Sequence, residues 1–144
     1  LMRWLGKIPA GTVNNSLVQN IDIAPTFLDI SGTPIPEWMQ GLSLKSLVQK
    51  QNGNLSRSSL YYHFYEVYAD HKVLPHLGVR NNRYKLVYFY SVDEWELYDL
   101  QSDPGELKNI YYDKKYAPVS KMMRQELDAA RNRYDDHEAA GILH

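Results

Sequence analysis

The stretch WELYDLQSDPGELKN, residues 95–109, decides the fold class of this chain. Its beginning alternates between apolar and acidic side chains, so that Trp95 and Leu97 fall on one face and the acids of 94–99 on the other. Alternation with a period of two is typical of a half-buried β-strand. The Asp-Pro-Gly-Glu run at 103–106 then predicts a turn, because proline fixes its own backbone angle and aspartate and glycine favour turns. The stretch therefore predicts a strand that ends in a turn.

The residues around this stretch extend it into a sheet with a helix against it. Residues 60–65 and 84–90 are rich in the aromatic and β-branched side chains that favour strands. Further on, apolar residues recur at helical spacing: Val119, Met122, Met123, Leu127, Ala130 and Tyr134. We expect a final helix over about 118–137 that lays this stripe across a small antiparallel sheet. The predicted fold class is α+β, and the 12 tyrosines fit sheet packing better than a sugar-stacking surface.

The first third of the chain reads differently. Residues 22–31 predict a short helix, with Asp22 as its N-cap, Pro25 in its first turn and Gly32 as its stop. We expect one face of that helix to carry Ile23, Phe27 and Ile30. An extended connector at 33–36 and a second helical turn at 41–48 follow. The polar run at 49–59 predicts a surface loop and the boundary between two parts of the chain.

Composition restricts the possible partners and sites. The 16 basic and 17 acidic residues give a net charge of −1, which offers no electrostatic reason to expect nucleic acid or an anionic membrane as partner. No apolar run approaches about 18 residues, so we expect no membrane span. The chain has no cysteine, which excludes disulfides, thiolate metal sites and a cysteine nucleophile within these 144 residues.

The candidate site residues lie in the loop 70–80. His71 and His76 are five residues apart with a proline between them, a spacing that disfavours a metal pair. Together with Lys72 and Arg80 they form a cationic loop that would contact an anionic ligand, although a solvated loop with polar strand caps explains the same residues. Two acidic groups, Asp99 with Asp103 and Asp135 with Asp136, are interpreted as turn chemistry and as an exposed helix end.

Several phrases, read as a whole, resemble the C-terminal part of a sulfatase of the arylsulfatase family, within the alkaline-phosphatase-like superfamily. The resemblance covers the chain in order, and the most specific match is the opening stretch, which is similar to Glu-Leu-Tyr-Asp-Leu-x-x-Asp-Pro-x-Glu-x-x-Asn. Other matches are the runs at 3–13, 17–32, 36–44 and 76–86. The narrower similarity is to the glycosaminoglycan or N-acetylglucosamine-6-sulfatase-like branch. Two residues depart from the family's pattern: Leu5 replaces a usual proline, and Leu42 a usual Arg or Lys.

The resemblance implies a fragment of a sulfuric ester hydrolase. Residues 1–56 would be the end of the catalytic α/β domain, with its last strand, helix and connector. Residues 57–144 would be the C-terminal subdomain, a roughly four-stranded antiparallel sheet packed against one long helix. Such enzymes use a formylglycine made in a Cys/Ser-x-Pro-x-Arg motif, and a bound calcium. Here the nearest match, at 102–106, ends in glutamate. We therefore expect both groups upstream, no catalytic or metal residue in this chain, and no activity of the chain alone.

The resemblance also suggests partners. The loop 70–80 would face a sulfated carbohydrate, with His76 bonding a sugar hydroxyl or sulfate and His71, Lys72 and Arg80 adding positive charge. Arg80 has a structural alternative, pairing with an acid such as Asp99. We expect the apolar surface of 1–35 to be covered by the remainder of the sulfatase chain, or by self-association. A periplasmic or secreted bacterial location is implied. A stand-alone carbohydrate-binding module and a purely structural subdomain remain as alternatives.

Overall fold

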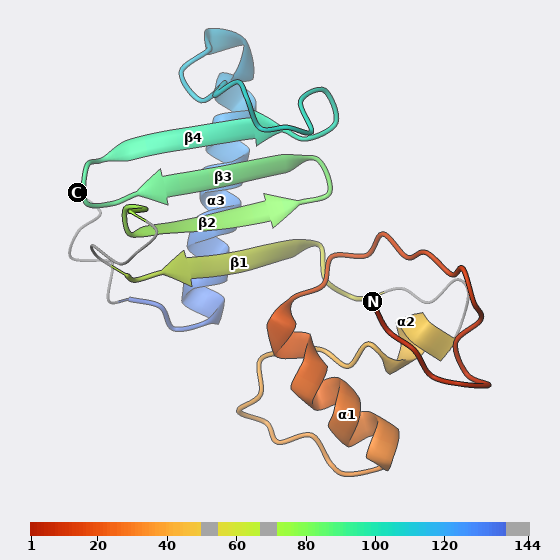
Figure 1. The fold of residues 1–144 in the computed structure, drawn as a ribbon. Coiled ribbons are helices and arrows are strands. Elements are labelled where there is room, and N and C mark those ends of the chain that lie inside the picture. Colours follow the sequence, from red (N-terminus) through yellow and green to blue (C-terminus); the bar gives the residue numbers. More distant parts are fainter. Residues whose placement is uncertain (50–54, 67–71, 138–144) are drawn as a thin grey trace. The chain divides into compact units, whose positions relative to one another are not determined.

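The computed structural model describes residues 1–49, 55–66 and 72–137 (Figure 1). Two compact units form, Leu1–Ser58 and Ser59–His144, and each is described by itself. His71 lies outside the described residues. The assignment of 1–56 and 57–144 to parts of two sulfatase domains stays a prediction.

The second unit is a four-stranded antiparallel sheet with one long helix across a face (Figure 1). The strands follow one another in space as they do in sequence, so each connection joins neighbours. The predicted α+β architecture is confirmed. The elements are β1 (Ser59–Phe64), β2 (His76–Asn81), β3 (Tyr84–Phe89), β4 (Glu94–Asp99) and α3 (Ala117–Arg133), with a single 3₁₀ turn, η2 (Lys114–Tyr116), before the helix.

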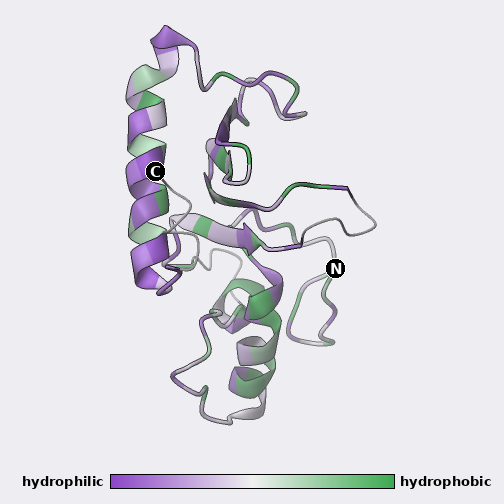
Figure 2. Cartoon of the chain, turned by 90° about the vertical axis from the view of Figure 1, so that its left-hand side faces the viewer, coloured by the Kyte–Doolittle hydropathy of each residue, from purple (hydrophilic) through white to green (hydrophobic). Residues whose placement is uncertain are grey.

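The hydrophobic core lies between α3 and one face of the sheet. Figure 2 shows α3 as a largely hydrophilic helix with hydrophobic bands. Met123 and Leu127 of α3 are fully buried, as are Leu77 of β2, Leu86 of β3 and Leu97 of β4, with which they form one cluster. Burying a side chain of this size contributes about 1.5–3 kcal/mol. The alternation that predicted the strands therefore corresponds to one buried face.

The final helix is shorter than expected and its stripe is narrower. It ends at Arg133 rather than 137, and Met122 from the predicted stripe is 44% exposed. The helix ends because Asp135 takes a left-handed backbone, with φ of 53°. The amides of Asp135 and Asp136 then donate to the carbonyls of Asn132 and Arg131, which is the Schellman pattern. An aspartate occupies the position that glycine usually takes, so the stop signal is not visible in the sequence.

The first unit contains η1 (Asn20–Asp22), α1 (Ile23–Ser31) and α2 (Lys45–Gln49). Gly32 ends α1 with φ of 76°, as predicted. No strand forms among residues 1–49 and 55–58, because a strand needs a paired neighbour and this unit supplies none. The expected apolar face of α1 is not part of a core here, since Ile23 is 48% and Phe27 65% exposed.

The predicted N-cap position of Asp22 is confirmed, but its side chain has another role. It stands at the N-cap position of α1 but makes no side-chain cap there. Its carboxylate is fully buried and accepts instead from Arg57, through two bonds of 2.6 Å, and from the amides of Gln19 and Leu42 at 2.7 and 2.8 Å. A buried carboxylate requires such charged and amide donors to offset its lost hydration. Asp22 therefore joins three segments of the unit.

Candidate functional site

The face of the sheet opposite α3 is the candidate site. Because side chains alternate along a strand, residues two apart share this face, called here the far face. Strand pairing places the following residues on it: Leu60, Tyr62, Phe64, His76, Gly78, Arg80, Lys85, Val87, Phe89, Glu94, Glu96 and Tyr98. Two of the four predicted site residues, His76 and Arg80, thus lie on one face of β2.

His76 sits in an aromatic cluster at the start of β2. Its ring lies 5.3 Å from that of Phe64, 5.1 Å from that of Phe89 and 5.9 Å, edge-on, from that of Tyr62. Nδ1 donates to the carbonyl of Leu74 at 2.8 Å. That bond selects the tautomer in which Nε2 is unprotonated, so Nε2 is an acceptor held in a fixed direction. The half-buried ring can accept a hydrogen bond from a hydroxyl or amide donor that reaches the far face.

The other predicted site residues are not gathered around His76. Arg80 is exposed and four residues further along β2, roughly 13 Å away at about 3.3 Å per residue. Lys72 is exposed, with φ of 48°, a backbone region that few non-glycine residues adopt. Asp99 is not the partner of Arg80, because it pairs with Arg83 at 2.9 and 3.2 Å. The hydrogen bonds from Arg83 hold the pKa of Asp99 below its usual value.

Tyr62 packs onto a glycine in the middle of the far face. A Cβ on Gly78 would lie 2.5 Å from the Tyr62 hydroxyl oxygen and 2.6 Å from the carbonyl oxygen of Leu86, so only glycine fits. The Tyr62 hydroxyl is buried and has no hydrogen-bond partner among the described residues. Burial raises the pKa of this hydroxyl well above its usual value. The hydroxyl therefore remains a neutral donor at physiological pH.

A buried polar cluster on the α3 side was missed from the sequence. The carboxylate of Asp136, 9% exposed, accepts from the hydroxyl of Tyr61 and lies 2.6 Å from Nδ1 of His63, while Nε2 of His63 is 3.4 Å from the hydroxyl of Tyr90. Burial acts to raise the pKa of Asp136, but the bonds from Tyr61 and His63 outweigh it and lower that pKa. The prediction of an exposed helix end is wrong at Asp136, because the Schellman turn carries it back to β1. In the sequence, the one indication of this cluster is the pair of polar side chains Tyr61 and His63, which alternate on one face of β1.

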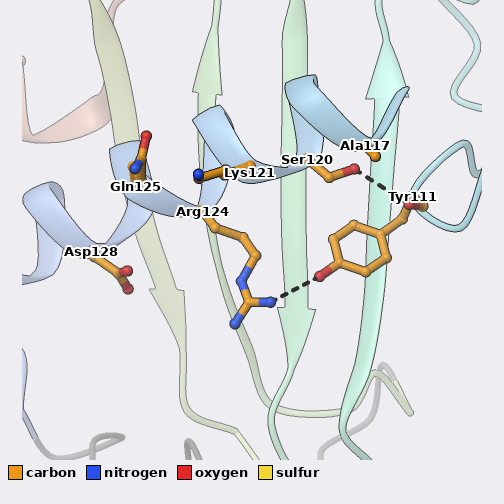
Figure 3. Close-up of a pocket in the computed structure, with 7 residues that line it drawn as sticks. All are labelled: Tyr111, Ala117, Ser120, Lys121, Arg124, Gln125 and Asp128. Atoms are coloured by element: carbon orange, nitrogen blue, oxygen red, sulfur yellow. Dashed lines mark hydrogen bonds between the residues drawn. The ribbon is translucent and has the colours of Figure 1, made fainter. Parts of the chain in front are cut away.

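A pocket of about 440 Å³ lies beside α3 (Figure 3). We call it the α3 pocket, and it is lined by Tyr111, Ala117, Ser120, Lys121, Arg124, Gln125 and Asp128. Figure 3 shows the Arg124 side chain directed toward the Tyr111 hydroxyl, with Nη1 3.5 Å from it. The Arg124 guanidinium also lies 4.7 Å from the ring of Trp95, on which Tyr111 stacks at 5.4 Å. No separate pattern in the sequence predicted this pocket.

The described residues contain neither a clustered metal site nor a membrane-spanning helix. Residues 1–49, 55–66 and 72–137 hold no group of three or more histidine, aspartate or glutamate side chains placed to bind a metal ion. Within the same ranges, no helix has the length and apolar character needed to cross a membrane.

Comparison with known proteins places this fold in a family. The chain matches the N-sulphoglucosamine sulphohydrolase C-terminal family over residues 1–133. It belongs to that family, and the resemblance to a sulfatase C-terminal part is confirmed.

Individual relatives are similar over nearly the whole chain. It is 38% identical to an N-acetylglucosamine-6-O-sulfatase of Bacteroides thetaiotaomicron over 141 residues, which cover 96% of this chain and 25% of that protein. A delta 4,5-hexuronate-2-O-sulfatase of the same bacterium is 31% identical over 81% of the chain and 24% of its own length. The structure of a protein solved in complex with its substrate, D-glucosamine-2-N,6-O-disulfate, is also similar. It matches with a TM-score of 0.89 and 38% identity over 94% of this chain and 28% of that one. The chain thus spans about a quarter of these proteins.

Proposed function

We propose that this chain is the C-terminal part of a sulfatase that hydrolyses sulfate esters on sulfated glycans. The observation that carries the proposal is the match over 94% of the chain, at a TM-score of 0.89, to a protein solved with a disulfated glucosamine as its substrate. The family match over residues 1–133 supports the same reaction class. A narrower assignment to an N-acetylglucosamine-6-sulfatase follows from the 38% identity to such an enzyme.

In this proposal, the rest of the longer protein carries out sulfate-ester hydrolysis, and this chain contributes to binding the glycan. The catalytic domain would supply the formylglycine of this enzyme class as the nucleophile, and the calcium that would offset the charge developing on the sulfate oxygens. The present residues contain no Cys/Ser-x-Pro-x-Arg motif. We expect the chain alone to release no product from 4-methylumbelliferyl sulfate, and release at an enzymatic rate would contradict this division. The bacterial relatives support a periplasmic or secreted location for the longer protein.

The far face is the proposed recognition surface. His76 presents Nε2 as an acceptor while Nδ1 is fixed on Leu74, which suits a hydrogen bond from a sugar hydroxyl. Lys72 and Arg80 are exposed cations before and after it on the chain, and they would attract sulfate groups on neighbouring sugars. His71 is proposed for the same role. These contacts would raise the affinity for glycans and contribute nothing to a small aryl sulfate.

The test compares two substrates in the longer protein. His76→Ala should lower kcat/KM for the native sulfated glycan about tenfold, since the proposed hydrogen bond from a sugar hydroxyl to Nε2 is lost. The same variant should leave hydrolysis of 4-nitrophenyl sulfate unchanged. His137→Ala, which removes a histidine whose side chain is 56% exposed, is the matched control. Unchanged glycan kinetics in His76→Ala would remove His76 from the site, and an equal loss on both substrates would indicate a structural role.

The exposed apolar side chains of the first unit suggest a packing partner. Val18, Ile21, Ile23 and Phe27 are all more than 40% exposed on the segment before and within α1. A contiguous apolar surface of this kind is usually covered by another surface. We infer that the rest of the sulfatase chain covers it, and that a second copy does so when the chain is alone. Light scattering at high concentration should then show a dimer, and a strict monomer would contradict this inference.

A further inference from the structure

The α3 pocket is lined by two cations, Lys121 and Arg124, and by one carboxylate, Asp128, so its lining carries a net positive charge. Residues 114–125 contain Lys114, Lys115, Lys121 and Arg124 and no acidic residue, whereas the whole chain has a net charge of −1. The pocket also opens on the first turns of α3, a helix of 17 residues, whose amino-terminal end carries a partial positive charge. A volume of about 440 Å³ is in the range of small-ligand sites. Size and charge together suit a small anionic ligand.

Trp95 and Tyr111 hold the guanidinium of Arg124, and no acidic side chain of the described residues forms an ion pair with it. Asp128 is four residues further along the helix, the spacing at which helical ion pairs form. The guanidinium lies instead over Trp95 at 4.7 Å and toward Tyr111. Among the ion pairs of the described residues, none includes Arg124 or Lys121. An aromatic clamp of this kind fixes the direction of the guanidinium while keeping donors free for a ligand.

We infer that the α3 pocket is a binding subsite for a sulfated sugar unit of the glycan. The inference rests on the proposed function, which supplies a sulfated polymer as the ligand class. In the pocket, Arg124 and Lys121 would bind one sulfate group, and the amide of Gln125 and the carboxylate of Asp128 would bond the sugar hydroxyls (Figure 3). The far face carries His76 on the opposite side of the sheet. A long glycan would therefore contact this unit at two places.

The test measures binding of three ligands to the chain by calorimetry. The ligands are a sulfated glycosaminoglycan hexasaccharide, the same hexasaccharide after desulfation, and inorganic sulfate. Arg124→Gln and Lys121→Gln remove one pocket cation each, and the exposed Lys121 makes no ion pair that would affect the fold. The matched control is Arg133→Gln, on the same helix, whose guanidinium also lies over an aromatic ring, that of Tyr134 at 5.5 Å. All three variants change the net charge equally.

The expected result is a pocket-specific loss. The sulfated hexasaccharide should bind Arg124→Gln about tenfold more weakly than the parent chain, since a charge-assisted bond is lost. Lys121→Gln should also weaken binding, Arg133→Gln should change the dissociation constant by less than about twofold, and the desulfated ligand should not bind. Fluorescence of Trp95, with Trp4 and Trp38 replaced by phenylalanine, should change on binding because Trp95 contacts Arg124.

Three outcomes would overturn the inference. Equal weakening in Arg124→Gln and Arg133→Gln would mean general charge attraction, and equal affinity for the desulfated ligand would exclude a role for sulfate. Inorganic sulfate that binds as tightly as the hexasaccharide would indicate a free-anion site. The proposed function is separable, since it is tested by sulfate release from the longer protein. If the longer protein releases sulfate normally and Arg124→Gln binds the hexasaccharide as tightly as the parent chain does, the subsite alone is rejected. If the subsite binds as expected but the longer protein releases no sulfate, the proposed function alone is rejected.

Discussion

Replacing Asp22 by asparagine should unfold the first unit. The substitution keeps the shape of the side chain but leaves the Arg57 guanidinium, whose side chain is 5% exposed, without a carboxylate. Removing one partner of a buried ion pair costs about 3–5 kcal/mol. At roughly 0.05–0.15 kcal/mol per residue, a unit of the length of Leu1–Ser58 is stabilised by only about 3–9 kcal/mol. The loss is therefore comparable to the whole stability of the unit.

The assay should resolve the two units separately. Hydrogen exchange followed by mass spectrometry reports on α1 and on the strands of the sheet in one experiment. We expect the α1 amides of Asp22→Asn to lose their protection, while those of β2 and β3 keep theirs. Asp29→Asn is the matched control, because Asp29 lies on the same helix and pairs with Lys45 in a half-exposed bridge at 2.8 Å. Surface bridges of this type contribute little.

One result would refute the reasoning. If α1 in Asp22→Asn is as well protected as in Asp29→Asn, the buried Asp22–Arg57 pair does not stabilise the unit. Arg57 would then be hydrated after a local rearrangement, and the burial seen in the structure would carry no energetic weight.

Three further outcomes concern a glycine of the sheet, the Asp136 cluster and the dependence of stability on pH. Gly78→Ala should lower the free energy of unfolding by about 1–3 kcal/mol, since its Cβ would overlap Tyr62 and the Leu86 carbonyl, whereas Gly105→Ala, with its nearest contact at 3.4 Å, should be neutral in the same urea titration. Asp136→Asn should lower the free energy of unfolding by about 1–3 kcal/mol, because the bonds to Tyr61 and His63 are lost or weakened. Asp135→Asn is the control, since the Asp135 side chain is 93% exposed, and it should leave the melting temperature unchanged. Equal effects of the two substitutions would argue against the cluster. The pKa values of Asp22 and Asp136 in the folded chain are lowered from 3.8, so the unfolded chain takes up protons first as the pH falls. The free energy of unfolding should therefore decrease as the pH falls below about 3.8. Urea midpoints that stay constant from pH 5 to pH 3 would contradict this.

The sheet and its helix were predictable because each has a periodic pattern. The alternation through Trp95 and Leu97 and the helical recurrence of Met123 and Leu127 both reflect burial against a single partner surface. These patterns survive in the sequence because each buried position requires an apolar residue.

The polar contacts were less predictable because they depend on register and on turns. Arg80 and Arg83 are equally plausible partners of Asp99 in the sequence, and only the strand pairing, which sets Tyr84 opposite Asp99, decides for Arg83. The buried role of Asp136 depends on the left-handed backbone of Asp135, which no glycine announces. The aromatic rings around His76 come from the two strands that flank β2, namely β1 and β3, so no local pattern in the sequence could gather them.

The bond between Asp136 and His63 has a consequence for the order of events during synthesis. The two residues are 73 positions apart, and β1 is an edge strand of the sheet. A nascent chain can pair its strands as soon as they leave the ribosome, but the carboxylate that binds Tyr61 and His63 on the α3 side of β1 arrives only after α3 has been made. Until then these two side chains lack this partner, and the apolar face of the sheet is not covered by the helix and can join another chain. Late release of residues 134–137 therefore sets the period in which this unit is most exposed to aggregation and most dependent on chaperones.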